Sequence, residues 1–416
     1  MKKMLSLLLV LSLMLSPAGC ADSNMNNVKT DLMKNITARV IDTQPDTVAG
    51  AQAVTDFGIR LAQTGFKDNE NLLLSPLSIL CALAMTANGA KEQTRAQMEE
   101  IFGLSVDELN SYLHWYISTI PQGEKYKLLL ANSIWFTEDS RFTPEQDFLQ
   151  INADYYGADL YSAPFDHTTL DAINHWVEEK TDGMIDEVLN DIPPEAVMYL
   201  INALTFDAEW SSVYEKHDVH NRVFTKEDGT EQNIELMYAL ESRYLSDDLA
   251  TGFIKHYKSR SYAFVALLPR EGISIEEYLR SLTGERLRIL LDGVQNTPVR
   301  TAIPKFETQY STELSEILTS MGMTDAFHPQ NADFSALGTS TAGNIFISRV
   351  LHKTFISVSE QGTKAGAVTV VEPADGAAME PDKLQEVYLD RPFVYLLIDC
   401  ENGVPFFIGV MTDMKQ

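Results

Sequence analysis

His217 and His220, with two residues between them, are the most metal-like pair in this 416-residue sequence. Imidazole nitrogen is a common zinc ligand, so the two rings can contact one ion. A structural zinc site needs four ligands, however, and no cluster of cysteines or carboxylates accompanies the pair. Residues 338–343 lack the lysine and the strand-to-helix setting of a phosphate-binding loop, which predicts a plain loop. The sequence therefore predicts neither a metal site nor a cofactor.

Catalytic nucleophiles also lack a recognisable setting. The sequence contains no Gly-x-Ser-x-Gly, His-Glu-x-x-His, P-loop or dinucleotide motif, which an exported hydrolase of this length would usually show. Cys81 lies in an apolar helical stretch and Cys400 follows an apolar strand. Both are predicted to be small core residues rather than nucleophiles or disulfide partners. We predict no catalytic residue and therefore no enzyme.

The charge balance narrows the range of partners. The chain carries 59 acidic and 32 basic residues, a net charge of −27. A surface of this sign repels phosphate backbones, which excludes non-specific binding of nucleic acids. With 45% hydrophobic and 22% charged residues, the composition is that of a soluble globular protein.

One segment near the C-terminus combines two kinds of sequence. Residues 360–371 (Glu-Gln-Gly-Thr-Lys-Ala-Gly-Ala-Val-Thr-Val-Val) are small and then β-branched, and they follow a predicted strand. Residues 372–381 contain Pro, Asp and Gly and are typical of a loop. In an extended conformation Thr363, Ala365 and Ala367 would share one face, small enough to slide beneath a covering helix. A long loop in a compact domain is usually either functional or disordered, and the residues alone leave both open.

The rest of the chain must position this segment, and its patterns mix helices with strands. No internal repeat or composition break divides residues 51–416, which predicts one α+β domain with extensive antiparallel sheet. Ser75 is placed to cap a helix that has Pro76 at its first position, and Asn402-Gly403 predicts a tight hairpin. Helices are predicted at 52–66, 77–88 and 169–180, and strands at 72–75, 128–136, 197–206, 261–268, 301–307, 344–360, 391–400 and 406–411.

Residues 1–19 have the composition of an export signal, with two lysines, an apolar run and small residues before Cys20. The apolar run of 4–15 is shorter than the ~20 residues of a membrane-spanning helix. A Cys after Ala-Gly resembles a bacterial lipoprotein box, although Pro17 stands where Leu is usual. Two outcomes stay open: lipidation of Cys20, which anchors the chain outside the membrane, or cleavage and secretion. Residues 20–50 are predicted to be a flexible tether.

Distinctive motifs follow one another in order over about 51–413. They are Asn71-Leu-Leu-Leu-Ser75-Pro76-Leu-Ser78-Ile79, Asn202-Ala203-Leu-Thr-Phe206-Asp-Ala-Glu-Trp210, Ile303-Pro304-Lys305-Phe306, Gly322-Met323-Thr-Asp325-Ala-Phe327, Ala332-Asp333-Phe334-Ser335, His352-Lys353, Glu360-x-Gly362-Thr363-x-Ala365, Arg391-Pro392-Phe393 and Pro405-Phe406-x-x-Gly409. In this order they resemble the motifs of the serpins, and specifically those of an exported bacterial serpin of the inhibitory type.

The resemblance implies a metastable central sheet with an exposed reactive-centre loop. A serine protease that cleaves the loop forms an acyl-enzyme, the cleaved loop inserts as a new strand, and the protease is distorted before it can deacylate. The implied function is that of a monomeric, irreversible suicide inhibitor of serine endopeptidases. Trapping of some cysteine proteases stays open, as does the alternative of a non-inhibitory serpin that acts as a binding or structural module.

The resemblance also implies roles for single residues. Where the sheet parts, at the shutter, short polar side chains would exchange hydrogen bonds between two states; at the breach, the loop enters first; at the hinge, small residues permit insertion. The implied shutter residues are Ser75, Ser78, Asn202 and His352, the breach residues are Trp210, Lys305 and Glu360, and the hinge residues are Glu360, Gly362, Thr363, Ala365, Gly366 and Ala367. The implied reactive-bond window is Gly376, Ala377, Ala378 and Met379, whose small or unbranched side chains suit an elastase-like or subtilisin-like protease.

Overall fold

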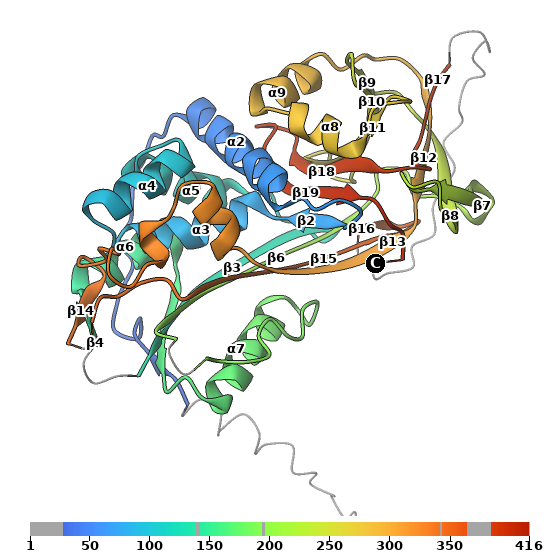
Figure 1. Ribbon diagram of the computed structural model, residues 1–416. Coiled ribbons are helices and arrows are strands. Elements are labelled where there is room, and N and C mark those ends of the chain that lie inside the picture. Colours follow the sequence, from blue (N-terminus) through green and yellow to red (C-terminus); the bar gives the residue numbers. More distant parts are fainter. Residues whose placement is uncertain (1–27, 139–141, 194–195, 342, 364–383, 416) are drawn as a thin grey trace, which may run out of the picture.

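A seven-stranded sheet forms the centre of the structure, a computed structural model that describes residues 28–138, 142–193, 196–341, 343–363 and 384–415. The sheet mixes parallel and antiparallel neighbours, and helices cover both of its faces (Figure 1). Its order is β1 (Thr30–Asp31), β5 (Asp159–Ala163), β3 (Tyr126–Thr137), β6 (Met198–Glu209), β16 (Gly362–Thr363), β15 (Arg349–Val358) and β13 (Phe306–Glu313).

A six-stranded and a four-stranded sheet lie beside the seven-stranded sheet (Figure 1). The six-stranded sheet has the order β2 (Leu72–Leu74), β19 (Pro405–Met411), β18 (Phe393–Asp399), β11 (Tyr262–Pro269), β10 (Ala250–His256) and β9 (Tyr244–Ser246). The four-stranded sheet has the order β17 (Gln385–Tyr388), β12 (Val299–Pro304), β8 (Glu231–Glu241) and β7 (Val219–Thr225). A short pair joins β4 (Phe142–Pro144) to β14 (Gly338–Ser340).

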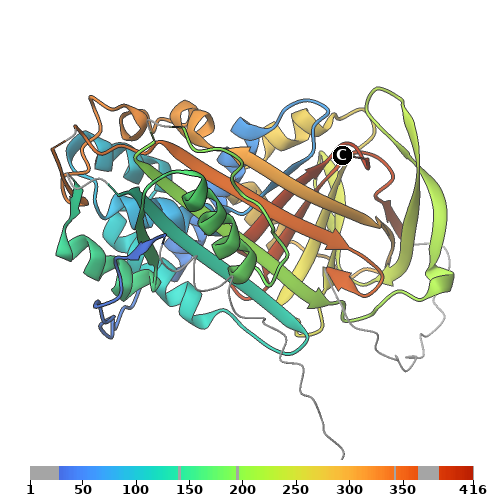
Figure 2. The same cartoon turned by 90° about the horizontal axis from the view of Figure 1, so that it is seen from below.

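Most of the described helices lie on one side of the seven-stranded sheet, whereas α7 lies on the other (Figures 1 and 2). Every residue of α3 is buried, as the all-round apolar sequence of this helix predicts. The helices are α2 (Thr47–Gly65), α3 (Pro76–Ala87), α4 (Glu92–Phe102), α5 (Val106–Thr119), α6 (Gln146–Tyr156), α7 (His167–Lys180), α8 (Ile275–Ser281), α9 (Gly284–Asp292) and α10 (Ser315–Ser320).

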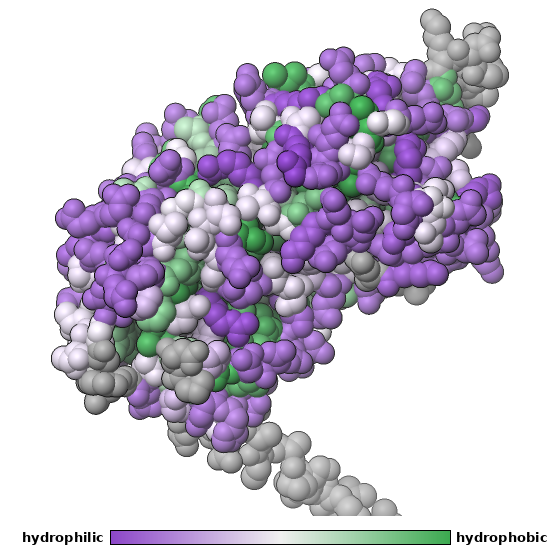
Figure 3. All heavy atoms as spheres, viewed as in Figure 1, coloured by the Kyte–Doolittle hydropathy of each residue, from purple (hydrophilic) through white to green (hydrophobic). Residues whose placement is uncertain are grey.

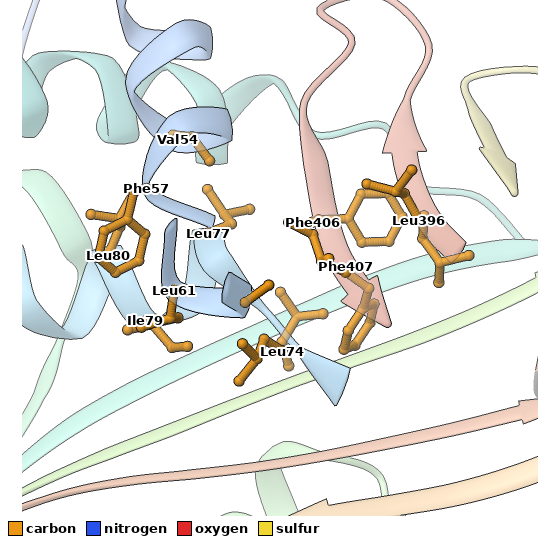
Figure 4. Packing of buried hydrophobic residues seen from close by; sticks show 14 of the residues in the cluster. Val54, Phe57, Leu61, Leu74, Leu77, Ile79, Leu80, Leu396, Phe406 and Phe407 are labelled. Atoms are coloured by element: carbon orange, nitrogen blue, oxygen red, sulfur yellow. The ribbon is translucent and has the colours of Figure 1, made fainter. Parts of the chain in front are cut away.

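The main core lies between α2, α3 and the six-stranded sheet. Phe57 of α2, Leu77 and Leu80 of α3 and Phe406 of β19 are fully buried and belong to one cluster (Figure 4). Burying side chains of this size contributes about 1.5–3 kcal/mol each. The face seen in Figure 3 is largely hydrophilic, in keeping with the net charge of −27. No helix in the described part of the chain is long and apolar enough to cross a bilayer.

The α+β class is confirmed, but several predicted elements have different bounds. The predicted strand 301–307 is two strands in different sheets, β12 and β13, which meet at Lys305. The predicted strand 344–360 begins only at Arg349, and the predicted loop 338–343 contains β14. Ser75 occupies the N-cap position of α3 with Pro76 after it, yet its hydroxyl makes no capping hydrogen bond.

The described part of the predicted tether lies against the domain. Residues 30 and 31 form the edge strand β1, which pairs with β5, and α2 begins already at Thr47. Arg39 binds the buried carboxylate of Asp154 through its side chain and through its backbone N–H, at 2.7 Å. Tertiary pairing therefore orders a segment whose own sequence shows little periodicity.

Candidate functional site

The candidate site is the seam between β6 and β15, in the middle of the seven-stranded sheet (Figure 2). Residues 199–204 and 349–354 of the two strands pair directly and in parallel, and we call this stretch the closed seam. Further along, β16 stands between them. Gly362 and Thr363 pair with Glu209 and Ala208 of β6, and Thr363 also pairs with Val358 of β15. This stretch is the wedged seam.

A chain of hydrogen bonds crosses the closed seam. The backbone N–H of Ser75 donates to His352 Nε2 at 3.1 Å. Because Nε2 accepts, the ring proton lies on Nδ1, which donates to Asn202 Oδ1 at 3.0 Å. The amide of Asn202 donates in turn to Asn132 Oδ1 at 3.0 Å. The chain therefore links the start of α3 to β15, β6 and β3.

Burial keeps the histidine of this hydrogen-bond chain neutral. His352 is only 1% exposed, and burial lowers its pKa to about 3, so the ring is neutral at physiological pH. The hydroxyls of Ser75, Ser78 and Thr205 are also buried, and within the described residues they have no hydrogen-bond partner. Each such hydroxyl costs free energy until it finds a partner. Three hydroxyls with unused hydrogen-bonding capacity are thus buried near the closed seam, two at the start of α3 and one just past residue 204 of β6.

The wedged seam is filled by the first two residues of the small-residue segment. A Cβ at Gly362 would lie 2.0 Å from the carbonyl oxygen of Ala208, so only glycine fits between the strands. Thr363 is 1% exposed, and its Oγ1 lies 2.5 Å from the phenol oxygen of Tyr257, which is also buried. The side chain of Thr363 is therefore packed inside the sheet.

Trp210 holds the turn that leads into β16. Its indole N–H donates to the carbonyl of Ser359 at 2.9 Å, and its backbone N–H donates to the carbonyl of Gln361 at 2.9 Å. Its ring stacks on Tyr257 with centroids 4.4 Å apart. The cation over the Trp210 ring is Lys255, at 5.5 Å. One indole thus contacts both the turn and the phenol that lies against Thr363.

An ion pair lies at the surface of the wedged seam. Lys305 Nζ is 2.9 Å from a carboxylate oxygen of Glu360 and 3.0 Å from one of Glu235. The hydrogen bond to Glu360 raises the pKa of Lys305. Burial alone would raise the pKa of Glu360, but the hydrogen bond and charge of Lys305 lower it below its usual value. About 30% of each side chain stays exposed, so water and salt weaken the pair.

Comparison with known proteins identifies the fold. The family model described as Serpin (serine protease inhibitor) matches residues 52–414. The chain belongs to the serpin family. The predicted resemblance is confirmed at the level of the family, whose members are generally protease inhibitors rather than enzymes.

Individual relatives agree with this assignment. The serpin is 29% identical over 371 residues to an uncharacterized serpin-like protein of Thermococcus kodakarensis, covering 88% of this chain and 85% of that protein. It is 30% identical over 355 residues to the leukocyte elastase inhibitor of Homo sapiens, covering 82% and 92%. The crystal structure of the thermophilic serpin tengpin in the native state has 48% identity and a TM-score of 0.89, covering 92% and 99%.

The structure of this serpin brings most of the expected site residues to the seam, and some lie outside it. Ser75, Asn202 and His352 share one hydrogen-bond chain, with Ser78 buried in the next turn. Trp210 contacts the turn before β16, while Lys305 binds Glu360. Outside the described residues lie Cys20, Ala365, Gly366, Ala367, Gly376, Ala377, Ala378 and Met379.

Several residues at the seam were not predicted from the sequence. Asn132 ends the chain across the closed seam, and Thr354 Oγ1 donates to the carbonyl of Leu73 at 3.0 Å. Lys255 lies on β10, in the six-stranded sheet, and Tyr257 lies directly after this strand. Thr354 lies in the closed seam itself, whereas Asn132, Lys255 and Tyr257 reach the seam from distant parts of the chain, where no local pattern marks them.

The histidine pair and the cysteines have other surroundings. His217 lies 3.3 Å from Glu215 and 3.5 Å from Asp218, whereas His220 lies against the ring of Tyr238. In the described ranges, no group of three or more His, Cys, Asp and Glu side chains is placed to hold a metal ion. Cys81 and Cys400 are free thiols, and burial raises both pKa values, that of Cys400 to about 12. Both thiols are therefore protonated at neutral pH.

Proposed function

We propose that this serpin is a suicide inhibitor of serine endopeptidases with elastase-like or subtilisin-like specificity. The observation that carries the proposal is the wedge: Gly362 and Thr363 already pair with β6, and Thr363 with β15. These two residues lead directly into the segment that contains the reactive-bond window. The first two residues of a new strand between β6 and β15 are therefore already in place, and a cleaved loop could extend that strand.

The chemistry of trapping uses one covalent step. The protease serine attacks a carbonyl carbon in the window, its oxygen becomes acylated, and the segment after the cut leaves with a new amino terminus. An extended strand from Thr363 to Gly376 would contain 14 residues and span 13 steps of ~3.3 Å, about 43 Å. The buried hydroxyls of Ser75, Ser78 and Thr205 are available to the polar groups of a strand that parts the seam.

The comparisons support this proposal at a coarser level. The leukocyte elastase inhibitor of Homo sapiens is 30% identical to this chain, and its name gives it an elastase as target. The small apolar side chains of the window, Gly376 to Met379, fit the primary pocket of such a protease. Cysteine proteases form a second class to assay, because the same strand insertion acts on any acyl-enzyme.

The test uses the full chain with pancreatic elastase and with subtilisin. We expect an SDS-stable complex, and mass spectrometry of the released peptide should show that it begins at Ala377, Ala378, Met379 or Glu380. Elastase with a blocked active-site serine is the control and should give no complex. Cleavage without a complex, together with an unfolding midpoint that does not rise after cleavage, would establish the non-inhibitory alternative instead.

We also propose export of the chain, followed by lipidation of Cys20 or by release. The support comes from the signal-like residues 1–19 and from Cys20 after Ala-Gly. Expression in a bacterial host with radiolabelled palmitate should label the wild type and not Cys20→Ala. Unlabelled protein in the medium would favour secretion, and unprocessed protein in the cytosol would contradict export.

A further inference from the structure

The ends of three strands from three different sheets meet around Lys255. This lysine is the last residue but one of β10, and its Nζ lies 2.7 Å from Glu241 Oε1, at the end of β8. The rings of Trp210 and Tyr214, which follow β6, lie 5.5 Å and 4.4 Å from the same Nζ. One ammonium group of the six-stranded sheet thus contacts the four-stranded sheet and the segment that continues the seven-stranded sheet.

Lysine is an unusual residue for this position. Its side chain is only 1% exposed, whereas that of Glu241 is 19% exposed. Removing an ammonium ion from water costs free energy, which the carboxylate and the two ring faces offset. A methionine would fill a similar volume without that cost, because a buried ion pair is often no more stabilising than well-packed apolar side chains. Stability alone therefore does not account for a charge here.

The two rings at Lys255 belong to the segment that holds the turn before β16. The backbone N–H of Tyr214 donates to the carbonyl of Glu360 at 3.0 Å. The backbone N–H of Trp210 donates to the carbonyl of Gln361, and its indole N–H donates to that of Ser359, each at 2.9 Å. One short segment thus binds three consecutive carbonyls, and β16 begins with the next residue. The position of this segment therefore fixes where β16 enters the sheet.

We propose that Lys255, paired with Glu241, is a positioning residue for strand insertion, an inference that rests on the proposed function. By attracting the rings of Trp210 and Tyr214, its ammonium group keeps the turn at 359–361 in place, so that β16 stays paired with β6. A cleaved loop then lengthens an existing strand and does not have to start a new one.

Insertion of the loop competes with hydrolysis of the acyl-enzyme. In hydrolysis, water attacks the acyl carbonyl carbon and the ester bond to the protease serine breaks. The serine oxygen regains a proton, and the cleaved chain ends in a carboxylate. A turn that is no longer held lets β16 detach, so insertion starts later and more acyl-enzyme is hydrolysed. Loss of Lys255 should therefore shift the chain from inhibitor toward substrate.

The test uses two variants that separate positioning from stability. Lys255→Met leaves the Glu241 carboxylate without its cation, whereas the double variant Lys255→Met/Glu241→Leu removes the whole pair and should unfold near the wild-type midpoint. In the double variant the backbone N–H groups of Trp210 and Tyr214 should exchange with deuterium about tenfold faster, measured by mass spectrometry of peptides that contain residues 210–214. The number of inhibitor molecules consumed per trapped pancreatic elastase or subtilisin should rise severalfold.

The matched control is Lys226→Met. Lys226 Nζ lies 2.8 Å from a carboxylate oxygen of Asp413, and the two side chains are 15% and 13% exposed. This pair is also largely buried, but it lies at the other end of β8 from Glu241. The control should lower the unfolding midpoint, and it should change neither the exchange of residues 210–214 nor the inhibitor-to-protease ratio.

The two measurements separate this inference from the function on which it rests. If the wild type forms no SDS-stable complex, the proposed function fails, and the exchange rates alone decide whether Lys255 holds the turn. Wild-type exchange in the double variant overturns the inference, and so does a wild-type ratio despite faster exchange. Equal changes in Lys226→Met would assign the effect to a general loss of stability, which also overturns it.

Discussion

The closed and the wedged parts of the seam are stabilised in different ways. In the closed seam the two strands pair directly, and a buried chain through His352 and Asn202 crosses them. In the wedged seam β16 separates the strands, and the ion pair of Lys305 and Glu360 lies at the surface. Breaking the closed seam leaves buried polar groups without hydrogen-bond partners, which costs free energy. The charges of a separated surface ion pair are instead solvated by water, so breaking that pair costs little.

Coverage by α7 adds to this difference. Trp176 of α7 packs in a separate hydrophobic cluster with Tyr199 and Ile201 of β6 and Leu351 of β15, which are residues of the closed seam. Lys353, also in this stretch, binds the carbonyl of Glu187 in the segment after α7. The closed seam is thus held from both faces of the sheet. A strand that enters between β6 and β15 should therefore begin at the wedged seam.

The largest expected effect is at the wedged seam itself. Thr363→Arg should turn the proposed inhibitor into a substrate, because a long charged side chain would have to enter a site that is 1% exposed. We expect the number of inhibitor molecules consumed per trapped protease to rise at least tenfold in a titration on SDS gels. Thr363→Ser keeps the hydroxyl and should stay close to the wild type. Undiminished trapping by Thr363→Arg would show that insertion does not start here.

Stability should depend much more on the closed seam. His352→Leu leaves the Ser75 N–H and the Asn202 carbonyl oxygen without a partner, and should lower the free energy of unfolding by about 2–4 kcal/mol. Glu360→Gln, the matched change in the wedged seam, should cost less than about 1 kcal/mol. Guanidinium unfolding of both variants measures the difference. Equal losses would contradict the contrast between the two parts.

The same histidine should make stability depend on pH. The pKa of His352 is about 3 in the folded protein and near 6.5 in an unfolded chain. Between these values only the unfolded state binds the proton, so stability decreases as the pH falls from 6.5 toward 3. Between pH 6.5 and 5 the wild type should lose roughly 1.5 kcal/mol more than His352→Gln. Parallel unfolding curves for the two proteins would show that His352 titrates normally.

The smallest expected effect concerns the contact between Tyr257 and Thr363. Tyr257→Phe removes one buried hydrogen bond and should cost about 1 kcal/mol of stability. The double variant with Thr363→Val removes both hydroxyls, and it should therefore be less destabilised than the sum of the single changes. A double-mutant cycle by thermal unfolding measures this coupling. Strict additivity would mean that the two hydroxyls do not interact in solution.

Much of the fold and part of the site were predictable because their signals are local. The mostly apolar run of α3, the strand that contains Phe206 and the Asn402-Gly403 turn each follow from neighbouring residues, and each lies where it was predicted. The polar residues Ser75, Asn202 and His352 came from motifs, and the structure joins them in one chain. The sequence predicted one strand through Lys305, whereas the structure has two strands in different sheets, β12 before it and β13 after it. No local pattern marks the point where the chain passes from one sheet to the other.

The sequence by itself determined the family, the α+β class and the run of mostly small residues at 362–367, since these depend on residue type and order along the chain. Only the tertiary structure decided that Thr363 is already buried between two strands and that Tyr257, 106 positions away, contacts it. It alone brought Lys255 over the ring of Trp210 and joined Asn202 of β6 to Asn132 of β3. The physical reason is that register and sheet order pair residues from distant segments, and neither leaves a trace in the local sequence.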